Sequence, residues 1–182
     1  MKKNKKIISC VAGRSGGHII PCLTLTNAYT NNGYDLLFFT SAQELDTLIL
    51  KNYTTITHHI PLTIINVPYK KIWKLPLFLT QFCISFFKSL YFFIKSRPER
   101  LISTGGYISI PTCLAAKILW IPIDIYELNV VPGKATTLLA YLTSNIFICF
   151  AKTARYFSKK TIVTHYPIRF AHTNSKDPIP AL

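Results

Sequence analysis

The sequence predicts an α/β fold with a doubly wound parallel sheet, and three features of the chain lead to this fold class. Short apolar runs of strand length alternate with segments of helical periodicity between residues 6 and 163. That alternation is typical of a parallel sheet with helices on both faces. Loops containing glycine or proline follow four of the apolar runs, and no internal repeat interrupts the order. At 182 residues the chain is long enough to bury a core.

The first third of the chain predicts three strands and two helices. Lys6–Ala12 is a short apolar run, as a buried strand requires, and the loop RSGGH follows it. Ile19–Asn31 has helical periodicity, with Pro21 in the first turn, where a proline is tolerated. After the turn NNGYD come a strand at Leu36–Thr40, a helix at Ala42–Asn52 and a strand at Thr55–Ile60.

The second half of the chain predicts four more strands. The strand Arg100–Ser103 ends at TGGY, and Ser109 is placed to cap the helix that follows. The remaining elements are a helix at Pro111–Leu119, a strand at Ile123–Tyr126, a helix at Lys134–Leu142, and strands at Ile146–Phe150 and Thr161–Val163. Because residues 171–182 are polar and interrupted by proline, we expect one domain over residues 1–170 and a frayed tail.

The segment Ile72–Ile94 departs from this pattern because it is apolar over almost its whole length. It approaches the ~20 residues of a transmembrane helix. On a helical wheel its polar residues form one narrow stripe: Gln81, Ser85, Lys88, Ser89 and Lys95. Pro76, the central Lys88 and the flanking lysines favour a helix lying in a membrane interface, while an ordinary packed helix and a true span stay open. The expected membrane contacts are Ile72, Trp73, Phe78, Phe82, Phe86, Phe87 and Phe92.

The charge is strongly basic, with 21 Lys and Arg against 7 Asp and Glu and a net charge of +14. Such a field attracts nucleic acid, anionic membranes or phosphorylated ligands. Nucleic acid has little support as a partner, because the aromatic residues lie in apolar runs rather than among arginines on strands.

The five cysteines, Cys10, Cys22, Cys83, Cys113 and Cys149, lie far apart, and no spacing typical of a metal or redox pair occurs. We expect them to be small buried hydrophobes in a reducing cytoplasm. We expect no metal, no cofactor and no secretion signal, because the apolar run after KKNKK is too short for one.

Four loops at strand ends are the candidates for a site: GRSGGH, TGGYIS, ELNVVPG and HYPIR. In a doubly wound sheet they meet at one edge, where ligands bind. GRSGGH is neither a Walker A loop nor a dinucleotide fingerprint. Its glycines permit close approach of a ligand, and the following helix N-terminus favours anions and disfavours a protonated imidazole at His18. The alternative interpretation, that the loop is only a glycine turn with His18 at the start of the helix, stays open.

Taken together, the four loops resemble the N-terminal half of the MurG family, the peripheral-membrane N-acetylglucosaminyltransferases that convert lipid I to lipid II. The resemblance runs from Lys6 to Arg169. It rests on Gly13, Ser15-Gly16-Gly17-His18, Pro21, Gly105-Gly106-Tyr107, Ser109, Pro111, Glu127, Asn129, Pro132-Gly133, Pro167 and Arg169.

This resemblance implies a Rossmann-like acceptor domain of a GT-B glycosyltransferase on the cytoplasmic face of the cell membrane. His18 would be the catalytic base, with Glu127 as the next candidate. The implied substrate contacts are Ser15, Gly16, Gly17, Gly105, Gly106, Tyr107, Asn129 and Arg169. The implied substrates are UDP-GlcNAc and undecaprenyl-diphosphate-linked muramoyl peptide, and a non-catalytic remnant that binds membrane or polyprenyl diphosphate is the alternative.

The chain also departs from the family pattern. Arg14 stands where the family usually has glycine, Tyr126 and Leu128 replace a histidine and a glutamine, and His165-Tyr166 replaces Gly-Asn. The second Rossmann domain, which holds most of the donor nucleotide in the family, is missing from the 182 residues. We therefore expect a separate donor-domain chain to be needed for transfer.

Overall fold

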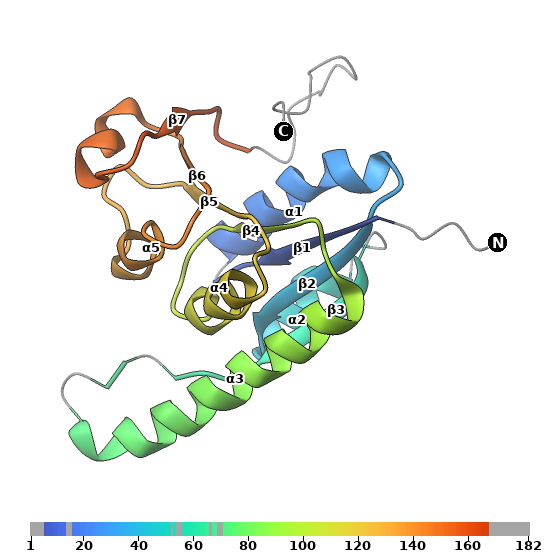
Figure 1. Cartoon of the computed structure of the whole chain (residues 1–182), viewed down its shortest axis with the longest axis vertical. Helices are drawn as coiled ribbons and strands as arrows, with labels where there is room; N and C mark the ends of the chain where they lie inside the picture. Colours follow the sequence, from blue (N-terminus) through green and yellow to red (C-terminus); the bar gives the residue numbers. More distant parts are fainter. Residues whose placement is uncertain are drawn as a thin grey trace.

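A seven-stranded parallel sheet forms the centre of the molecule (Figure 1). The computed structural model describes residues 6–13, 16–51, 53, 56–65, 67–68 and 71–167. The strand order is β3-β2-β1-β4-β5-β6-β7, so the predicted fold class is confirmed. The strands are β1 (Ile7–Val11), β2 (Asp35–Ser41), β3 (Ile56–Leu62), β4 (Arg100–Ser103), β5 (Ile123–Glu127), β6 (Asn145–Ile148) and β7 (Ile162–Val163).

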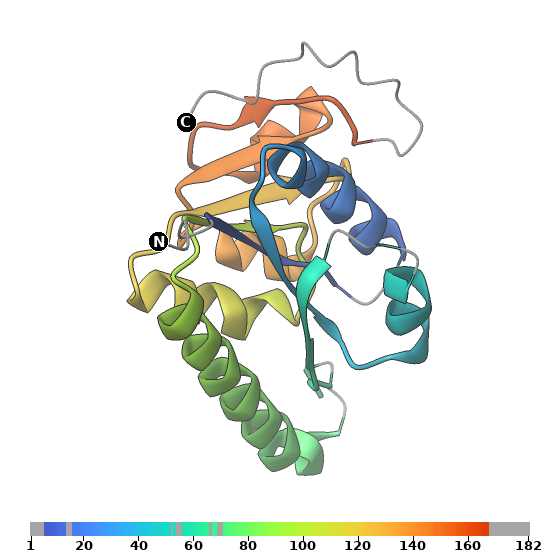
Figure 2. The same ribbon diagram turned by 90° about the vertical axis from the view of Figure 1, so that its right-hand side faces the viewer.

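Helices cover both faces of the sheet (Figure 2). One face carries α1 (Gly16–Asn31) and α2 (Glu44–Lys51). The other face carries α3 (Leu75–Ser96), α4 (Ser109–Ile118) and α5 (Lys134–Leu139). Two short 3-10 helices, η1 (Ile72–Lys74) and η2 (Ala151–Tyr156), complete the elements of the described residues.

The period-two alternation of β2 builds both halves of the core. Leu37 and Phe39 point toward the α3 and α4 side, where Phe39 meets Phe93 edge-to-face at 5.2 Å between ring centroids. Leu36 and Phe38 point to the opposite side and pack with α1 and α2. A strand that is buried on both faces therefore reads as a continuous apolar run, which is what the sequence shows.

Helix α1 begins three residues earlier than the sequence predicts, at Gly16 instead of Ile19. Pro21 consequently lies in the second turn. The N–H that Pro21 lacks would have bonded to the carbonyl of Gly17. Gly17 is exposed, so water can solvate its carbonyl and the helix tolerates the proline.

Helix α4 also starts earlier than predicted, and Ser109 is its first residue rather than its N-cap. The hydroxyl of Ser109 donates to the carbonyl of Gly105 at 2.7 Å instead of capping the helix. The prediction that Ser109 caps α4 is therefore wrong, because the residue already lies inside the helix. The 3-10 helix η2 was not expected from the sequence at all.

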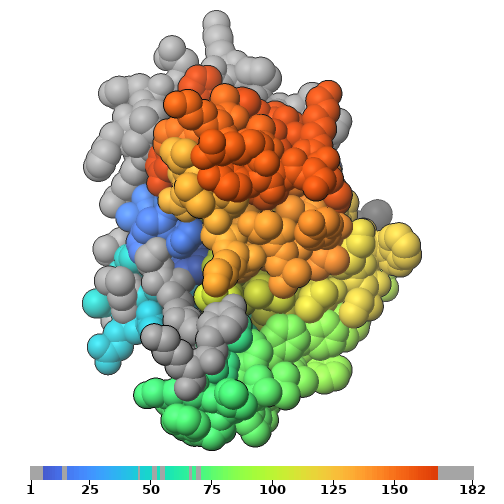
Figure 3. Space-filling model, turned by 90° about the vertical axis from the view of Figure 1, so that its left-hand side faces the viewer, coloured from blue at the N-terminus to red at the C-terminus, as the bar shows by residue number. Residues whose placement is uncertain are grey.

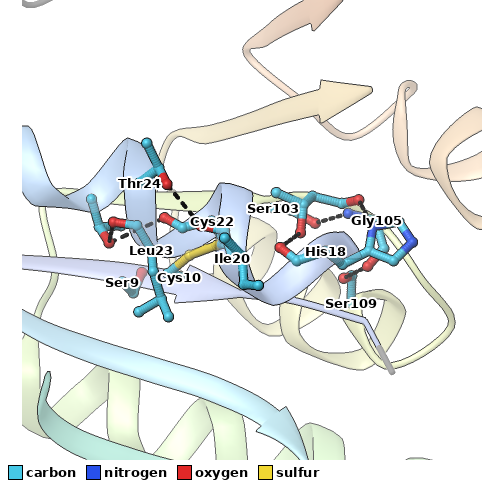
Figure 4. Close-up of a disulfide and its surroundings, with 12 residues drawn as sticks. Ser9, Cys10, His18, Ile20, Cys22, Leu23, Thr24, Ser103, Gly105 and Ser109 are labelled. Carbon is cyan, nitrogen blue, oxygen red and sulfur yellow. Dashed lines mark hydrogen bonds between the residues drawn. A yellow bond between two sulfur atoms is a disulfide. The ribbon is translucent and has the colours of Figure 1, made fainter. Parts of the chain in front are cut away.

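Two cysteines form a disulfide between Cys10 on β1 and Cys22 on α1 (Figure 4). Both are fully buried where the helix packs on the strand. The expectation of free thiols is wrong for this pair, because a 12-residue separation in sequence gives no sign that packing brings the two sulfurs together. Cys113 is free and buried, and burial raises the pKa of its thiol to about 12. Cys83 is exposed, which also contradicts the expectation, and Cys149 is half-buried.

Three residues of the polar stripe of α3, Gln81, Ser85 and Lys88, face the end of β3 and the residues that follow it. Lys88 Nζ donates to the Pro61 carbonyl at 2.7 Å, and Ser85 Oγ donates to the Thr63 carbonyl at 3.2 Å. Gln81 Oε1 accepts the Ile65 N–H at 2.9 Å. We call these three bonds the polar ladder. It pairs one face of the helix with residue 61 of the edge strand β3 and with residues 63 and 65 just beyond that strand.

The opposite side of α3 is apolar and faces away from the protein. Its large side chains are between 50% and 63% exposed, and we call them the outer face: Leu77, Ile84, Phe87, Tyr91 and Ile94. Ile72 and Trp73 of η1 are exposed as well. By length and composition Ile72–Ser96 is one helical segment of the described chain that is apolar enough to cross a membrane. In Figure 3 this green surface forms one end of the molecule, opposite the orange and red surface of residues 140–167.

Four of the residues expected at the membrane lie on the flanks of α3 that face the protein. Phe78, Phe82, Phe86 and Phe92 are partly buried and pack against the core. Of the expected set, Ile72, Trp73 and Phe87 are exposed.

Candidate functional site

The site lies where the strand order of the sheet reverses. Strands β1 and β4 are neighbours, with Val11 in register with Ser103, although the helices that follow them lie on opposite faces. The chain therefore diverges beyond the carboxyl ends of these strands, and this switch point is where open α/β sheets bind ligands. The loops after β1, β4 and β5 all open on this edge, as the sequence predicts.

The two loops at the switch point touch through glycines. A Cβ atom on Gly106 would lie 2.8 Å from the Cα atom of Gly13, which is closer than real Cβ atoms approach. Gly106 also has a φ of +91°, which side chains rarely adopt. The backbones of the two loops thus pack directly on each other, and this packing explains glycine at 106 without any ligand.

His18 is the third residue of α1, and its ring reaches across to the loop after β4. The Nδ1 atom lies 2.8 Å from the Thr104 carbonyl oxygen. Because a carbonyl can only accept, Nδ1 carries the proton and Nε2 keeps a free lone pair. The Thr104 hydroxyl donates back to the main-chain carbonyl of His18 at 3.1 Å. The half-buried imidazole is thereby arranged to accept a proton at Nε2.

The loop after β4 is itself held by serine side chains. The Gly105 N–H donates to Ser103 Oγ at 3.2 Å, while Ser109 Oγ donates to the Gly105 carbonyl. Figure 4 shows these side chains grouped around His18. A rigid loop fixes the direction of the carbonyl that holds the imidazole.

Glu127 is buried, and its carboxylate is hydrogen-bonded within its own loop. The carboxylate is 3% exposed, and its Oε1 accepts from both the main-chain N–H and the side-chain amide of Asn129, each at 2.9 Å. Its Oε2 accepts the Gly133 N–H at 3.3 Å. Both oxygens therefore hold the 127–133 loop in shape, and this geometry supports a structural part for Glu127 rather than proton transfer.

The remaining predicted substrate contacts are distributed over the same edge. Gly16 and Gly17 form the first turn of α1, Tyr107 is half-buried just before α4, and Asn129 is exposed. Ser15 and Arg169, together with Arg14, lie outside the described residues. Thr104 was not singled out from the sequence, although its place directly before Gly105-Gly106 is a signal that could have found it.

Two of the residues that differ from the family pattern are part of the hydrophobic core. Tyr126 and Leu128 are buried, and the Tyr126 ring stacks on Phe147 with 4.5 Å between centroids. Burial raises the pKa of the Tyr126 hydroxyl well above its usual value. Among the described residues there is no group of three or more His, Cys, Asp or Glu side chains that could hold a metal ion.

The parallel sheet and its flanking helices have the Rossmann-like arrangement of one half of a GT-B glycosyltransferase fold. More narrowly, the chain belongs to the glycosyltransferase family 28 N-terminal domain family, whose signature matches residues 8–148. That match runs from the second residue of β1 to the end of β6 and includes His18, Thr104 and Glu127, whereas Arg169 lies beyond it.

Curated relatives carry the same enzyme name. The UDP-N-acetylglucosamine–N-acetylmuramyl-(pentapeptide) pyrophosphoryl-undecaprenol N-acetylglucosamine transferase of Prochlorococcus marinus strain MIT 9312 is 33% identical over 170 residues. This match covers 92% of the chain and 44% of the relative. The corresponding protein of Thermosipho africanus strain TCF52B is 30% identical and covers 91% and 49%. The chain therefore spans about half the length of these relatives.

Solved structures show the same fold. MurG of Acinetobacter baumannii superposes with a TM-score of 0.75 at 20% identity, over 88% of this chain and 46% of that one. MnaA of S. aureus, solved with UDP, gives a TM-score of 0.63 at 14% identity over 88% of this chain and 44% of that one. At such identities the likeness establishes the arrangement of the sheet and helices.

Proposed function

We propose that this chain is the acceptor half of an inverting N-acetylglucosaminyltransferase of peptidoglycan synthesis. The donor is UDP-GlcNAc and the acceptor is the undecaprenyl-diphosphate-linked muramoyl pentapeptide, as the names of the relatives indicate. The chain spans about half the length of these relatives, so the proposal concerns the acceptor half alone. The observation that carries the proposal is the bond from His18 Nδ1 to the Thr104 carbonyl, which leaves Nε2 as a base at the switch point.

The proposed step is a single displacement. The oxygen of the muramoyl 4-hydroxyl forms a bond to C1 of GlcNAc, and the hydroxyl proton passes to His18 Nε2. The bond between C1 and the diphosphate oxygen breaks, UDP leaves with the electron pair, and C1 is inverted. The N-terminus of α1, a 16-residue helix, supports binding of a diphosphate beside this base.

The position of α3 supports contact with a membrane at the same edge. In Figure 1 the carboxyl ends of β1 and the N-terminal end of α3 with η1 lie on the same side of the molecule. The outer face offers an apolar surface, and Lys71, Lys74, Lys95 and Arg97 are exposed at its two ends. We infer peripheral binding on the cytoplasmic face, which brings the lipid-linked acceptor to the switch point.

The catalytic proposal is tested by His18→Ala, with the donor half of a full-length relative supplied and transfer of GlcNAc to a lipid I analogue measured. General base catalysis typically contributes ~10²–10⁴-fold, so turnover should fall by about that factor while the melting temperature is kept. His58→Ala, on the exposed edge strand β3, is the matched control. Full turnover in His18→Ala would show that another residue is the base. No turnover in the wild type would favour the alternative that the chain is a non-catalytic remnant.

The membrane proposal is tested with vesicles containing an anionic phospholipid. Replacing Ile84, Phe87 and Tyr91 by serine should release the protein without unfolding it, because these side chains are about 60% exposed. Phe93→Ser is the contrasting variant, since that residue is 1% exposed and its loss should destabilise the fold. Binding should weaken with salt, because each surface lysine contributes ~1 kcal/mol. Resistance of the wild type to carbonate extraction would mean that the segment spans the bilayer.

A further inference from the structure

We propose that Thr104 is a positioning residue that fixes the orientation and the tautomer of the His18 imidazole. The inference rests on the proposed function in that His18 is the base that Thr104 positions. Two hydrogen bonds join these residues, which lie 86 positions apart in the chain. The main-chain carbonyl of Thr104 holds the ring at Nδ1, and its hydroxyl holds the backbone of the same histidine.

The two bonds have different effects. The bond to Nδ1 joins the loop after β4 to a side chain, which can rotate about its own single bonds. The second bond, from the Thr104 hydroxyl to the His18 carbonyl at 3.1 Å, fixes the position of this loop relative to the first turn of α1. Together they hold His18 at its ring and at its main chain, so Nδ1 stays against the carbonyl and Nε2 stays free.

Thr104 is itself held firmly. It is 2% exposed, and its own N–H donates to the Val11 carbonyl at 3.3 Å, at the end of β1. Gly105 follows with a φ of +90°, so the chain turns directly after Thr104, and Ser109 fixes the Gly105 carbonyl. The Thr104 carbonyl that accepts the hydrogen bond from His18 is therefore held in place between β1 and α4.

The side chain at 104 must be small, buried and a hydrogen-bond donor. Serine keeps the donor, whereas valine keeps the shape of threonine and removes it. The main-chain carbonyl of His18 lies inside α1, where a hydrogen bond of the helix can still satisfy it. Thr104→Val therefore does not leave a buried acceptor without a hydrogen bond, which is the usual cost of such a substitution. The pair of variants thus separates positioning from packing.

The experiment measures the protonation of the two His18 ring nitrogens by ¹⁵N NMR on the 182-residue chain, with His18→Gln to assign the signals. In the wild type above pH 8 we expect a protonated Nδ1 and a free Nε2, and the reverse tautomer would overturn the proposal without any variant. In Thr104→Val the carbonyl that accepts from Nδ1 remains but the contact that aligns it with His18 is lost, so the ratio of these tautomers should fall by about two- to fivefold, while Thr104→Ser should keep the wild-type ratio.

Activity gives the second readout, with the donor half supplied. Thr104→Val should lower kcat about fivefold with little change in KM, while Thr104→Ser stays near the wild type. The control is Thr26→Val, a buried threonine of α1 whose hydroxyl donates to the Cys22 and Leu23 carbonyls away from the site. Unchanged ring signals in Thr104→Val would refute the positioning role. A shifted tautomer in a system where His18→Ala keeps full turnover would instead support the positioning role and refute the proposed base.

Discussion

The glycines around the switch point differ in what a side chain at each position would meet. At Gly106 an added Cβ would clash with the Gly13 backbone, and the left-handed φ is strained for any other residue. At Gly133, which precedes α5, the φ is −66° and the nearest atom is the Thr136 hydroxyl oxygen, 3.9 Å away. The two positions therefore offer a matched pair for testing whether backbone packing holds the site together.

Gly106→Ala should lower the free energy of unfolding by at least about 2 kcal/mol, because strain and backbone overlap act together. Gly133→Ala should change it by less than about 1 kcal/mol in either direction. Urea denaturation of both variants measures the difference. Equal effects would show that the contact between the loops after β1 and β4 is not a determinant of stability.

The disulfide between Cys10 and Cys22 yields a second prediction at this scale. It closes a loop of 12 residues in sequence that contains GRSGGH, and a cross-link of that length stabilises a fold by about 3 kcal/mol in the chain-entropy treatment. Reduction with a phosphine should therefore lower the melting temperature clearly. Cys10→Ala/Cys22→Ala should melt near the reduced wild type and should not respond to the reductant. If the melting temperature of the wild type does not change when the reductant is added, the Cys10–Cys22 disulfide is contradicted.

At the scale of elements, α3 shows what a helical pattern leaves open. The sequence identifies the stripe through Gln81, Ser85 and Lys88 but does not say which neighbour it faces. The structure turns it inward, because the outer edge of the sheet offers main-chain groups that need partners. Periodicity gives the faces of a helix but carries no information about which neighbour each face meets.

The polar ladder predicts a specific loss of stability. Gln81→Met keeps the size of the side chain but removes the acceptor for the Ile65 N–H, which should cost about 1–2 kcal/mol. Thr80→Val is the control, because that exposed hydroxyl donates only to the Pro76 carbonyl within the same helix. Chemical denaturation distinguishes them, and equal stabilities would show that water replaces Gln81 at no cost.

At the scale of the whole molecule, the chain spans about half of its curated relatives, from 44% to 49% in the two named above. The resemblance assigns most of the nucleotide contacts to the other half. We therefore expect the 182-residue chain alone to bind UDP-GlcNAc weakly, if at all, as measured by calorimetry. Low-micromolar affinity of this chain alone would mean that its own loops hold the donor.

The sheet and its functional edge follow from the sequence, since buried parallel strands read as apolar runs and their ends carry the glycine loops. Thr104 is harder to predict because it binds His18 through a main-chain carbonyl, which every residue possesses. The Cys10–Cys22 pair depends on how α1 packs on β1, and the engaged oxygens of Glu127 depend on the shape of its loop. These features arise from tertiary geometry, which local patterns do not encode.

The polar ladder has an evolutionary consequence. All three of its bonds end on main-chain atoms of residues 61, 63 and 65, so the identities of those side chains do not enter the attachment. This border of the sheet can therefore accumulate substitutions while the helix stays in place, with proline at 65 as the one replacement that removes the donor. Selection on the attachment falls instead on Gln81, Ser85 and Lys88.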